Sequence, residues 1–194
     1  NYLPLYKQII LASRIAGSTS IGERKVFYFM GGVDSWLYQP KTDETFKPPN
    51  DPSFMYQSLA SPMRGFLKGV RSGNSFAVIN NEVRIPLAKV LSQKPLRNEF
   101  LETFQIVAFW DIGTAWTGSS PFNEDNEFNT QTFGGAGNPI SITINTQESP
   151  IVMGRGLGLR AKLFGYYIRT DWARGYVDFN KVDNAFYLSL SLDF

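Results

Sequence analysis

The acidic residue with the most distinctive surroundings is Asp111, which lies between Phe109 and Gly113 in a largely apolar segment. A carboxylate in such surroundings can serve as a general acid or base when a second acid or an imidazole lies beside it. The sequence positions no second acid next to Asp111, and the chain contains no histidine and no cysteine. Imidazole bases, thiol nucleophiles and Cys/His zinc sites are therefore excluded. We interpret Asp111 as the partner of an arginine and predict that the protein is not an enzyme.

Two other segments carry residues that occur in ligand sites, but their spacing argues against a ligand. In Gly154-x-Gly156-x-Gly158 the third glycine comes one residue too early for a dinucleotide-binding loop, and no helical pattern follows. The polar run Asn123–Glu127 lacks the spaced ligands and the glycine of a known calcium loop. Without a Gly-x-Ser-x-Gly motif or a histidine, a conventional catalytic triad is also excluded. We predict no catalytic residue, no metal and no cofactor.

The elements that must position these residues are β-strands, because apolar and polar side chains alternate along six segments. In the last of them, large apolar residues occupy every second position from Phe186 to Phe194. Between Phe104 and Trp116 one face is likewise apolar, whereas Asp111 lies on the other. A period of two residues places alternate side chains on opposite faces of a sheet. The six predicted strands cover residues 6–18, 78–85, 104–116, 156–163, 166–173 and 185–194.

Alternation of this kind is typical both of soluble β-sandwiches and of transmembrane β-barrels. Two details favour the barrel. The segments approach the ~10 residues that a tilted strand needs to cross a bilayer. Aromatic residues also gather near strand ends on the apolar face, as the pairs Phe104 and Trp116 and Tyr166 and Trp172 illustrate, and such girdles mark the two membrane interfaces. A soluble β-sandwich that acts as a binding module is the alternative.

The predicted connections differ in length on the two sides of the sheet. Residues 163–165 suffice only for a tight turn, and residues 87–102 form a modest link with room for one helical turn. Residues 19–74 and 117–149 form long loops rich in Gly, Pro, Asn and Ser, and residues 174–183 form an intermediate loop. If the strands run alternately up and down, these three loops lie on one side. Short turns on one side and long external loops on the other are the rule for outer-membrane barrels.

The overall composition sets further limits. The 194 residues are enough for one domain with a sizeable core, and no internal repeat or second domain is visible. The 19 basic residues nearly balance the 17 acidic ones, so the charge gives no reason to expect nucleic acid as a partner. No stretch approaches the ~20 apolar residues of a membrane-spanning helix. The chain opens at Asn1 rather than at methionine, so we expect a mature product or a fragment.

Five short motifs follow one another along these segments. They are Met63-Arg64-Gly65-Phe66, Asn81–Pro86, Phe109–Gly113, Gly156–Arg160 and Asp171. Together they resemble the BamA/TamA superfamily of outer-membrane assembly and translocation barrels, a bacterial surface antigen family. The resemblance covers residues 1–194 and implies the C-terminal portion, about the last six strands, of an antiparallel barrel of roughly sixteen strands. The end of the chain looks like the C-terminal signal of barrel proteins, carried by Phe186, Leu188, Leu190, Leu192 and Phe194.

The resemblance implies a structural role for the loop formed by residues 19–74. In the family this loop folds back into the barrel lumen, and the arginine of its signature pairs with an acidic residue on the inner wall. Carried over, Arg64 pairs with Asp111, and Glu82 is a second candidate. The planar guanidinium group suits a bidentate contact with a carboxylate.

Further residues of the motifs fit the same interpretation. Gly65 allows a tight turn beside Arg64, and Phe66 completes the signature. Gly113 faces inward and, like the glycines of the 156–160 motif, leaves room for the inserted loop. Arg160 and Asp171 are the signature residues of the last two motifs. The segment 33–62 is longer than the family pattern, and its role stays open.

The resemblance also implies a function. We expect a protein in the outer membrane of a Gram-negative bacterium that assists the insertion or translocation of other proteins. Its partners would be outer-membrane lipid or lipopolysaccharide, client outer-membrane proteins or a larger membrane complex, and further barrel strands from a missing N-terminal part or another chain. Tyr6–Ser18 and Ala185–Phe194 are expected to pair with those strands, because an open edge in lipid leaves backbone groups unpaired. A barrel that anchors an upstream enzymatic or binding domain is the alternative function.

Overall fold

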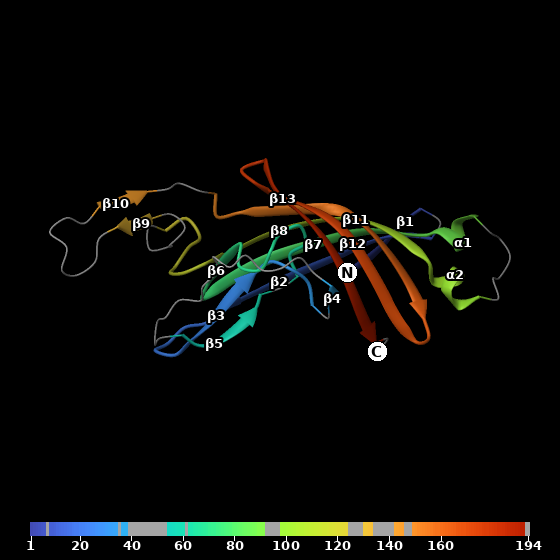
Figure 1. Ribbon diagram of the computed structural model, residues 1–194, viewed down its shortest axis with the longest axis horizontal. Coiled ribbons are helices and arrows are strands. Elements are labelled where there is room, and N and C mark those ends of the chain that lie inside the picture. The colour runs from blue at the N-terminus through green and yellow to red at the C-terminus, as the bar shows by residue number, and fades with distance from the viewer. Residues whose placement is uncertain are drawn as a thin grey trace.

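Most of the chain forms antiparallel β-strands, which confirms the predicted all-β class (Figure 1). The computed structural model describes residues 1–6, 8–34, 36–38, 54–60, 62–91, 98–123, 130–133, 142–145 and 149–192.

The main sheet contains all six strands that alternation predicts. Neighbouring strands are antiparallel, and each central strand has 11 to 13 residues. The six strands lie side by side in chain order: β2 (Ile9–Thr19), β7 (Ser75–Pro86), β8 (Gln105–Trp116), β11 (Val152–Leu163), β12 (Tyr166–Val177) and β13 (Asn180–Leu192).

Two-residue turns join β11 to β12 and β12 to β13. Phe164 and Gly165 have φ angles of 51° and 84°, and Asp178 and Phe179 have φ angles of 51° and 62°. Two consecutive positive φ angles are typical of a type I′ turn, whose twist matches that of the flanking strands. The prediction of an intermediate loop over residues 174–183 was therefore wrong, because both strands continue to the turn. The pair Asp178-Phe179 lacks the glycine that usually marks such a turn.

The link between β7 and β8 contains two short helices, α1 (Leu87–Leu91) and α2 (Glu99–Thr103), where one helical turn is expected from the sequence. The side chain of Asn98 caps α2 by accepting a hydrogen bond from the amide of Phe100. Within the described residues, no helix is long and apolar enough to cross a membrane.

The two long connections contain strands of their own. Residues 19–74 include a three-stranded sheet in the order β5 (Phe54–Leu59), β3 (Lys25–Met30), β6 (Arg71–Gly73), with β3 and β5 parallel. Residues 117–149 include the hairpin β9 (Thr130–Phe133) and β10 (Ile142–Asn145). These strands lie at one end of the main sheet, and α1 and α2 lie at the other (Figure 1). This confirms the prediction that the two long connections lie at one end of the sheet and the link 87–102 at the other.

The two edges of the main sheet are covered by short strands of the same chain. The strand β1 (Tyr2–Tyr6) pairs with β2, and β4 (Trp36–Tyr38) pairs with β13 at two positions. The sequence did not predict these two short partner strands, and the pairing of Tyr6–Ser18 and Ala185–Phe194 with strands outside the chain stays a prediction. A short turn before β2 lets the preceding residues pair with its exposed backbone groups, which any edge strand offers. The sheet is open in the described residues, since β1 and β4 are its outer strands.

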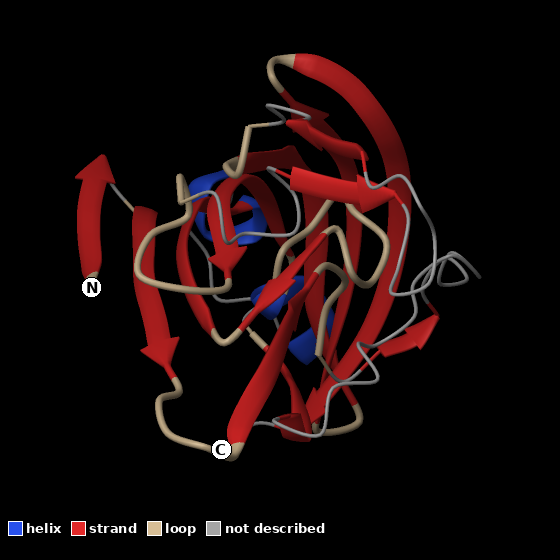
Figure 2. Cartoon of the chain, turned by 90° about the vertical axis from the view of Figure 1, so that its left-hand side faces the viewer, coloured by secondary structure: helices blue, strands red, loops and turns tan. Residues whose placement is uncertain are grey.

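The sheet curves strongly (Figure 2), and segments of the 19–74 connection pack against one of its faces. We call the face that contacts this connection the inner face and the opposite one the outer face. The main core lies on the inner face, where Val78, Ala115 and Val152 meet Met30 and Met63. The outer face exposes large apolar side chains on five neighbouring strands: Ile15, Ile79, Trp110, Leu157, Leu159 and Trp172.

Candidate functional site

The signature segment 62–66 docks on the inner face through its apolar residues. Met63 forms an isolated β-bridge with Gly32, and its amide donates a hydrogen bond of 3.0 Å to the carbonyl oxygen of Gly32. Met63 and Phe66 are buried, at 0% and 1% exposure, and both belong to the main core. The apolar residues on either side therefore hold Arg64 and Gly65 against the sheet wall.

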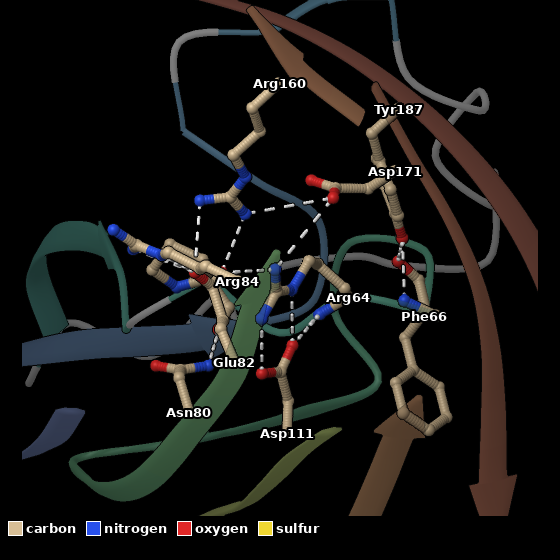
Figure 3. Close-up of polar contacts among 11 residues, drawn as sticks. Arg64, Phe66, Asn80, Glu82, Arg84, Asp111, Arg160, Asp171 and Tyr187 are labelled. Atoms are coloured by element: carbon tan, nitrogen blue, oxygen red, sulfur yellow. Dashed lines mark hydrogen bonds and ion pairs between the residues drawn. The ribbon is translucent and has the colours of Figure 1, made fainter. Parts of the chain in front are cut away.

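The side chain of Arg64 makes the two-pronged contact with Asp111 that the resemblance implies (Figure 3). Its Nε and Nη2 atoms donate hydrogen bonds of 2.7 Å to the two carboxylate oxygens of Asp111. The Nη1 atom donates a third bond of 2.7 Å to Oε1 of Glu82. Arg64 is 5% exposed and Asp111 is fully buried. All three nitrogens of the guanidinium group donate hydrogen bonds, which favours a fixed orientation of the side chain.

Three strands of the sheet supply further charged groups around this pair. Glu82 on β7 also accepts hydrogen bonds from Arg160 on β11, at 2.7 and 3.0 Å, and from Arg84, at 2.9 Å. Oδ1 of Asp171 on β12 lies 4.0 Å from Nη1 of Arg64 and 3.9 Å from Nη2 of Arg160. We call Arg64, Glu82, Asp111, Arg160 and Asp171 the inner-face network.

The network keeps Arg64 charged although the residue is buried. Burial disfavours the charged guanidinium, but the hydrogen bond to Asp111 and the negative charges of Asp111, Glu82 and Asp171 outweigh this cost and raise the pKa of Arg64 above its ordinary value. The guanidinium carbon also lies 3.7 Å from the centre of the Phe109 ring. A cation over an aromatic face gains further electrostatic attraction.

Tyr187 on β13 fastens the backbone of the same segment. Its hydroxyl group donates a hydrogen bond to the carbonyl oxygen of Phe66 and accepts one from the amide of Gly65 (Figure 3). Gly65 has a φ angle of 97°, which few residues other than glycine adopt. Sequence reasoning missed Tyr187, although an aromatic residue on a face otherwise lined by Ser and Asp was a usable signal.

Glycines on the sheet provide the space in which the segment lies. A Cβ atom at Gly154 would overlap the carbonyl oxygen of Arg64, and one at Gly175 would overlap that of Gly65. Gly154 and Gly175 are direct cross-strand partners on β11 and β12. Gly113 instead makes room for the sulfur of Met30, which lies 3.0 Å from an ideal Cβ position.

The C-terminal signal residues occupy a different part of the molecule. Phe186, Leu188 and Leu190 alternate with buried inner-face residues of β13 and therefore lie on its outer face, each half-buried. The ring of Phe186 lies 5.2 Å from that of Trp172. The side chain of Leu192 and the whole of Phe194 lie outside the described residues, as do residues 124–127 of the polar run.

A cavity of about 610 Å³ borders the network, with Arg64, Glu82, Arg84, Arg160 and Asp171 among its lining residues.

No family model, curated protein or solved structure matches this chain. In the described part of the chain, no group of three or more Asp or Glu side chains is arranged to hold a metal ion. All three guanidinium nitrogens of Arg64 donate to carboxylates of the sheet, so the arrangement is suited to fastening a loop.

Proposed function

We propose that this chain belongs to an outer-membrane β-barrel of the BamA/TamA type, which assists the insertion or translocation of other proteins in a Gram-negative bacterium. The observation that carries the proposal is the distribution of polarity across the main sheet. Leu157 and Trp172 on the outer face are 59% and 63% exposed, whereas the charged residues Asp111 and Asp171 on the inner face are 0% and 4% exposed.

This distribution is the reverse of that in a soluble sheet protein, where the charged side chains face water. A transmembrane barrel instead presents apolar residues to lipid and polar residues to its interior. The strand lengths of 11 to 13 residues also meet the ~10 residues needed to cross a bilayer at a tilt. Lipid around the outer face would shield the exposed apolar side chains from water.

The proposal requires additional strands beside those described. Unpaired backbone groups in hydrocarbon cost several kcal/mol each, and among the described residues β4 pairs with β13 only at Leu188 and Ser189. We propose that further strands, from a preceding part of the protein or another chain, complete the barrel. A weakly paired outer edge of β13 would form the labile seam at which a client strand could pair. The inner-face network would hold the loop in the lumen beside this seam.

The membrane part of the proposal is tested by fractionation of a Gram-negative host that expresses the full-length protein. We expect the protein in the outer-membrane fraction, resistant to extraction with alkaline carbonate. Recovery in the soluble fraction without detergent would contradict the barrel and favour the soluble β-sandwich.

The assembly part is tested by reconstitution into liposomes with an unfolded client barrel protein. We expect the client to fold into the bilayer faster with the wild-type protein than with Arg64→Ala, while Arg24→Ala, a change in an exposed loop residue, serves as the control. A protein that integrates into the membrane but gives no acceleration would favour an anchoring barrel.

A further inference from the structure

A row of polar residues crosses the outer face near the end that carries the long connections. Strand pairing aligns Trp110 with Arg155, Arg155 with Arg174, and Arg174 with Asn184. Arg155 and Arg174 are exposed. Each lies two positions from an exposed outer-face residue of its own strand, Leu157 and Trp172 respectively, and therefore lies on the same face. Two arginine side chains therefore project from directly opposite strand positions on the outer face.

The rows that follow toward α1 and α2 are apolar, apart from Thr170. The next row contains Ala108, Leu157, Trp172 and Phe186, and the one after it contains Ile106, Leu159, Thr170 and Leu188. On the other side of the arginine pair, one more apolar row with Ile79, Ile112 and Met153 precedes the end that carries the long connections. The arginine pair thus lies near one margin of the apolar band that these rows form on the outer face.

The width of this band agrees with a lipid-facing surface. The eight steps from Arg155 to Leu163 span ~27 Å at ~3.4 Å per residue, or roughly 21 Å across a membrane at a ~40° strand tilt. Outer-membrane barrels have an apolar band ~25 Å tall. With one apolar row beyond them, the two arginines would lie just inside the headgroup region, which their long side chains can reach.

The arginine pair has no acidic partner among the described residues, where no carboxylate forms an ion pair with Arg155 or Arg174. Like charges at directly opposite strand positions are unfavourable. Arg155 is held by Tyr176, whose hydroxyl oxygen accepts hydrogen bonds of 3.0 and 3.3 Å from Nη2 and Nε. An anion shared by both guanidinium groups would remove the repulsion.

We propose that Arg155 and Arg174 bind the phosphate group of an anionic lipid. The planar guanidinium fork matches a phosphate group. A cavity of about 720 Å³ is lined by both arginines and by the apolar residues Leu157, Trp172 and Phe186, so an acyl chain can continue from the headgroup along the apolar band. This inference rests on the proposed function, since it needs the outer face to contact lipid.

The test measures the quenching of tryptophan fluorescence by brominated lipids in bilayers that contain the full-length protein. Trp110 and Trp172 flank the arginine pair and report on the lipids beside it. We expect brominated phosphatidylglycerol to quench more strongly than brominated phosphatidylcholine at the same mole fraction. In the double variant R155Q/R174Q this preference is expected to fall on the order of tenfold, because each basic residue near the surface adds to the attraction.

The double variant R24Q/K89Q removes the same charge at exposed positions outside the row and should keep the preference. An equal loss in this control, or equal quenching by both lipids in the wild type, would overturn the site. Inorganic phosphate should leave the preference unchanged when compared with sodium chloride of the same ionic strength; its loss would assign the site to a free anion. Absence of quenching by either lipid would instead refute the membrane location of the proposed function.

Discussion

The hydroxyl group of Tyr187 donates a hydrogen bond of 2.7 Å to the carbonyl oxygen of Phe66, which lies 121 positions earlier in the chain. The same hydroxyl accepts a bond of 3.2 Å from the amide of Gly65. Tyr187 is 1% exposed, so water cannot replace either bond. The strand β13 and the tip of the 19–74 connection are therefore joined directly.

Replacement of Tyr187 by Phe should destabilise the protein by about 1–3 kcal/mol, because it leaves the buried carbonyl of Phe66 and amide of Gly65 without a partner. A denaturant titration in detergent micelles, followed by tryptophan fluorescence, measures the free energy of unfolding. Tyr166→Phe is the matched control, since Tyr166 is an exposed residue of the outer face, and it should change stability by less than about 0.5 kcal/mol. Equal effects of the two substitutions would contradict the role of Tyr187.

Arg64→Ala should cost more, about 3–5 kcal/mol, because it leaves the fully buried carboxylate of Asp111 without its counter-charge. The same titration tests this expectation, with Arg24→Ala as a control for the loss of an exposed arginine. An unfolding midpoint equal to that of the wild type would show that the network does not stabilise the docked loop.

A double-mutant cycle isolates the contact between Arg64 and Asp111. We expect the single substitutions Arg64→Ala and Asp111→Ala and their combination to give an interaction energy of about 0.5–3 kcal/mol. A parallel cycle with Arg64 and Glu99 should be additive within about 0.5 kcal/mol, because Glu99 pairs with Lys162 and shares no described partner with Arg64. Additivity in the first cycle would mean that the two residues do not stabilise one another.

Gly154→Ala should displace the signature segment, since the new Cβ would overlap the carbonyl oxygen of Arg64. Overpacking of this kind costs about 1–3 kcal/mol. Gly17→Ala provides the comparison, because Gly17 lies on β2 and its Cβ would meet only the backbone of the neighbouring strand. Limited proteolysis of the 19–74 connection gives an independent measure, and we expect faster cleavage in Gly154→Ala alone.

The six main strands could be predicted from sequence because each is long and alternates in polarity, as in β8 from Gln105 to Trp116. The short strands β3 to β6 could not, since three to six residues give too little periodicity. The parallel pairing of β3 with β5 depends on contacts between residues far apart in sequence. The turn at Asp178-Phe179 was missed because Phe179 stands where a glycine usually follows Asp in such a turn.

The contact of Arg64 with Asp111 was expected from a family resemblance and not from the pattern of the residues themselves. Alternation placed Asp111, Glu82 and Arg160 on the polar face of their strands. It could not predict the register between the strands, which decides which of these residues are neighbours. Tyr187 lies on the same face and was overlooked. Alternation alone gives no reason to expect that its hydroxyl group forms hydrogen bonds with the backbone of a segment far away in the sequence.

The inner-face network also solves a problem of strand alignment. A slip of one residue between neighbouring strands reverses their polarity and is strongly penalised, whereas a slip of two residues preserves it. Arg64 contacts Glu82 on β7 and Asp111 on β8, and lies 4.0 Å from Asp171 on β12. A two-residue slip would move one of these carboxylates by ~7 Å relative to the others. The contacts of Arg64 thus distinguish the observed strand alignment from a two-residue slip, which keeps the same residues on the polar and apolar faces.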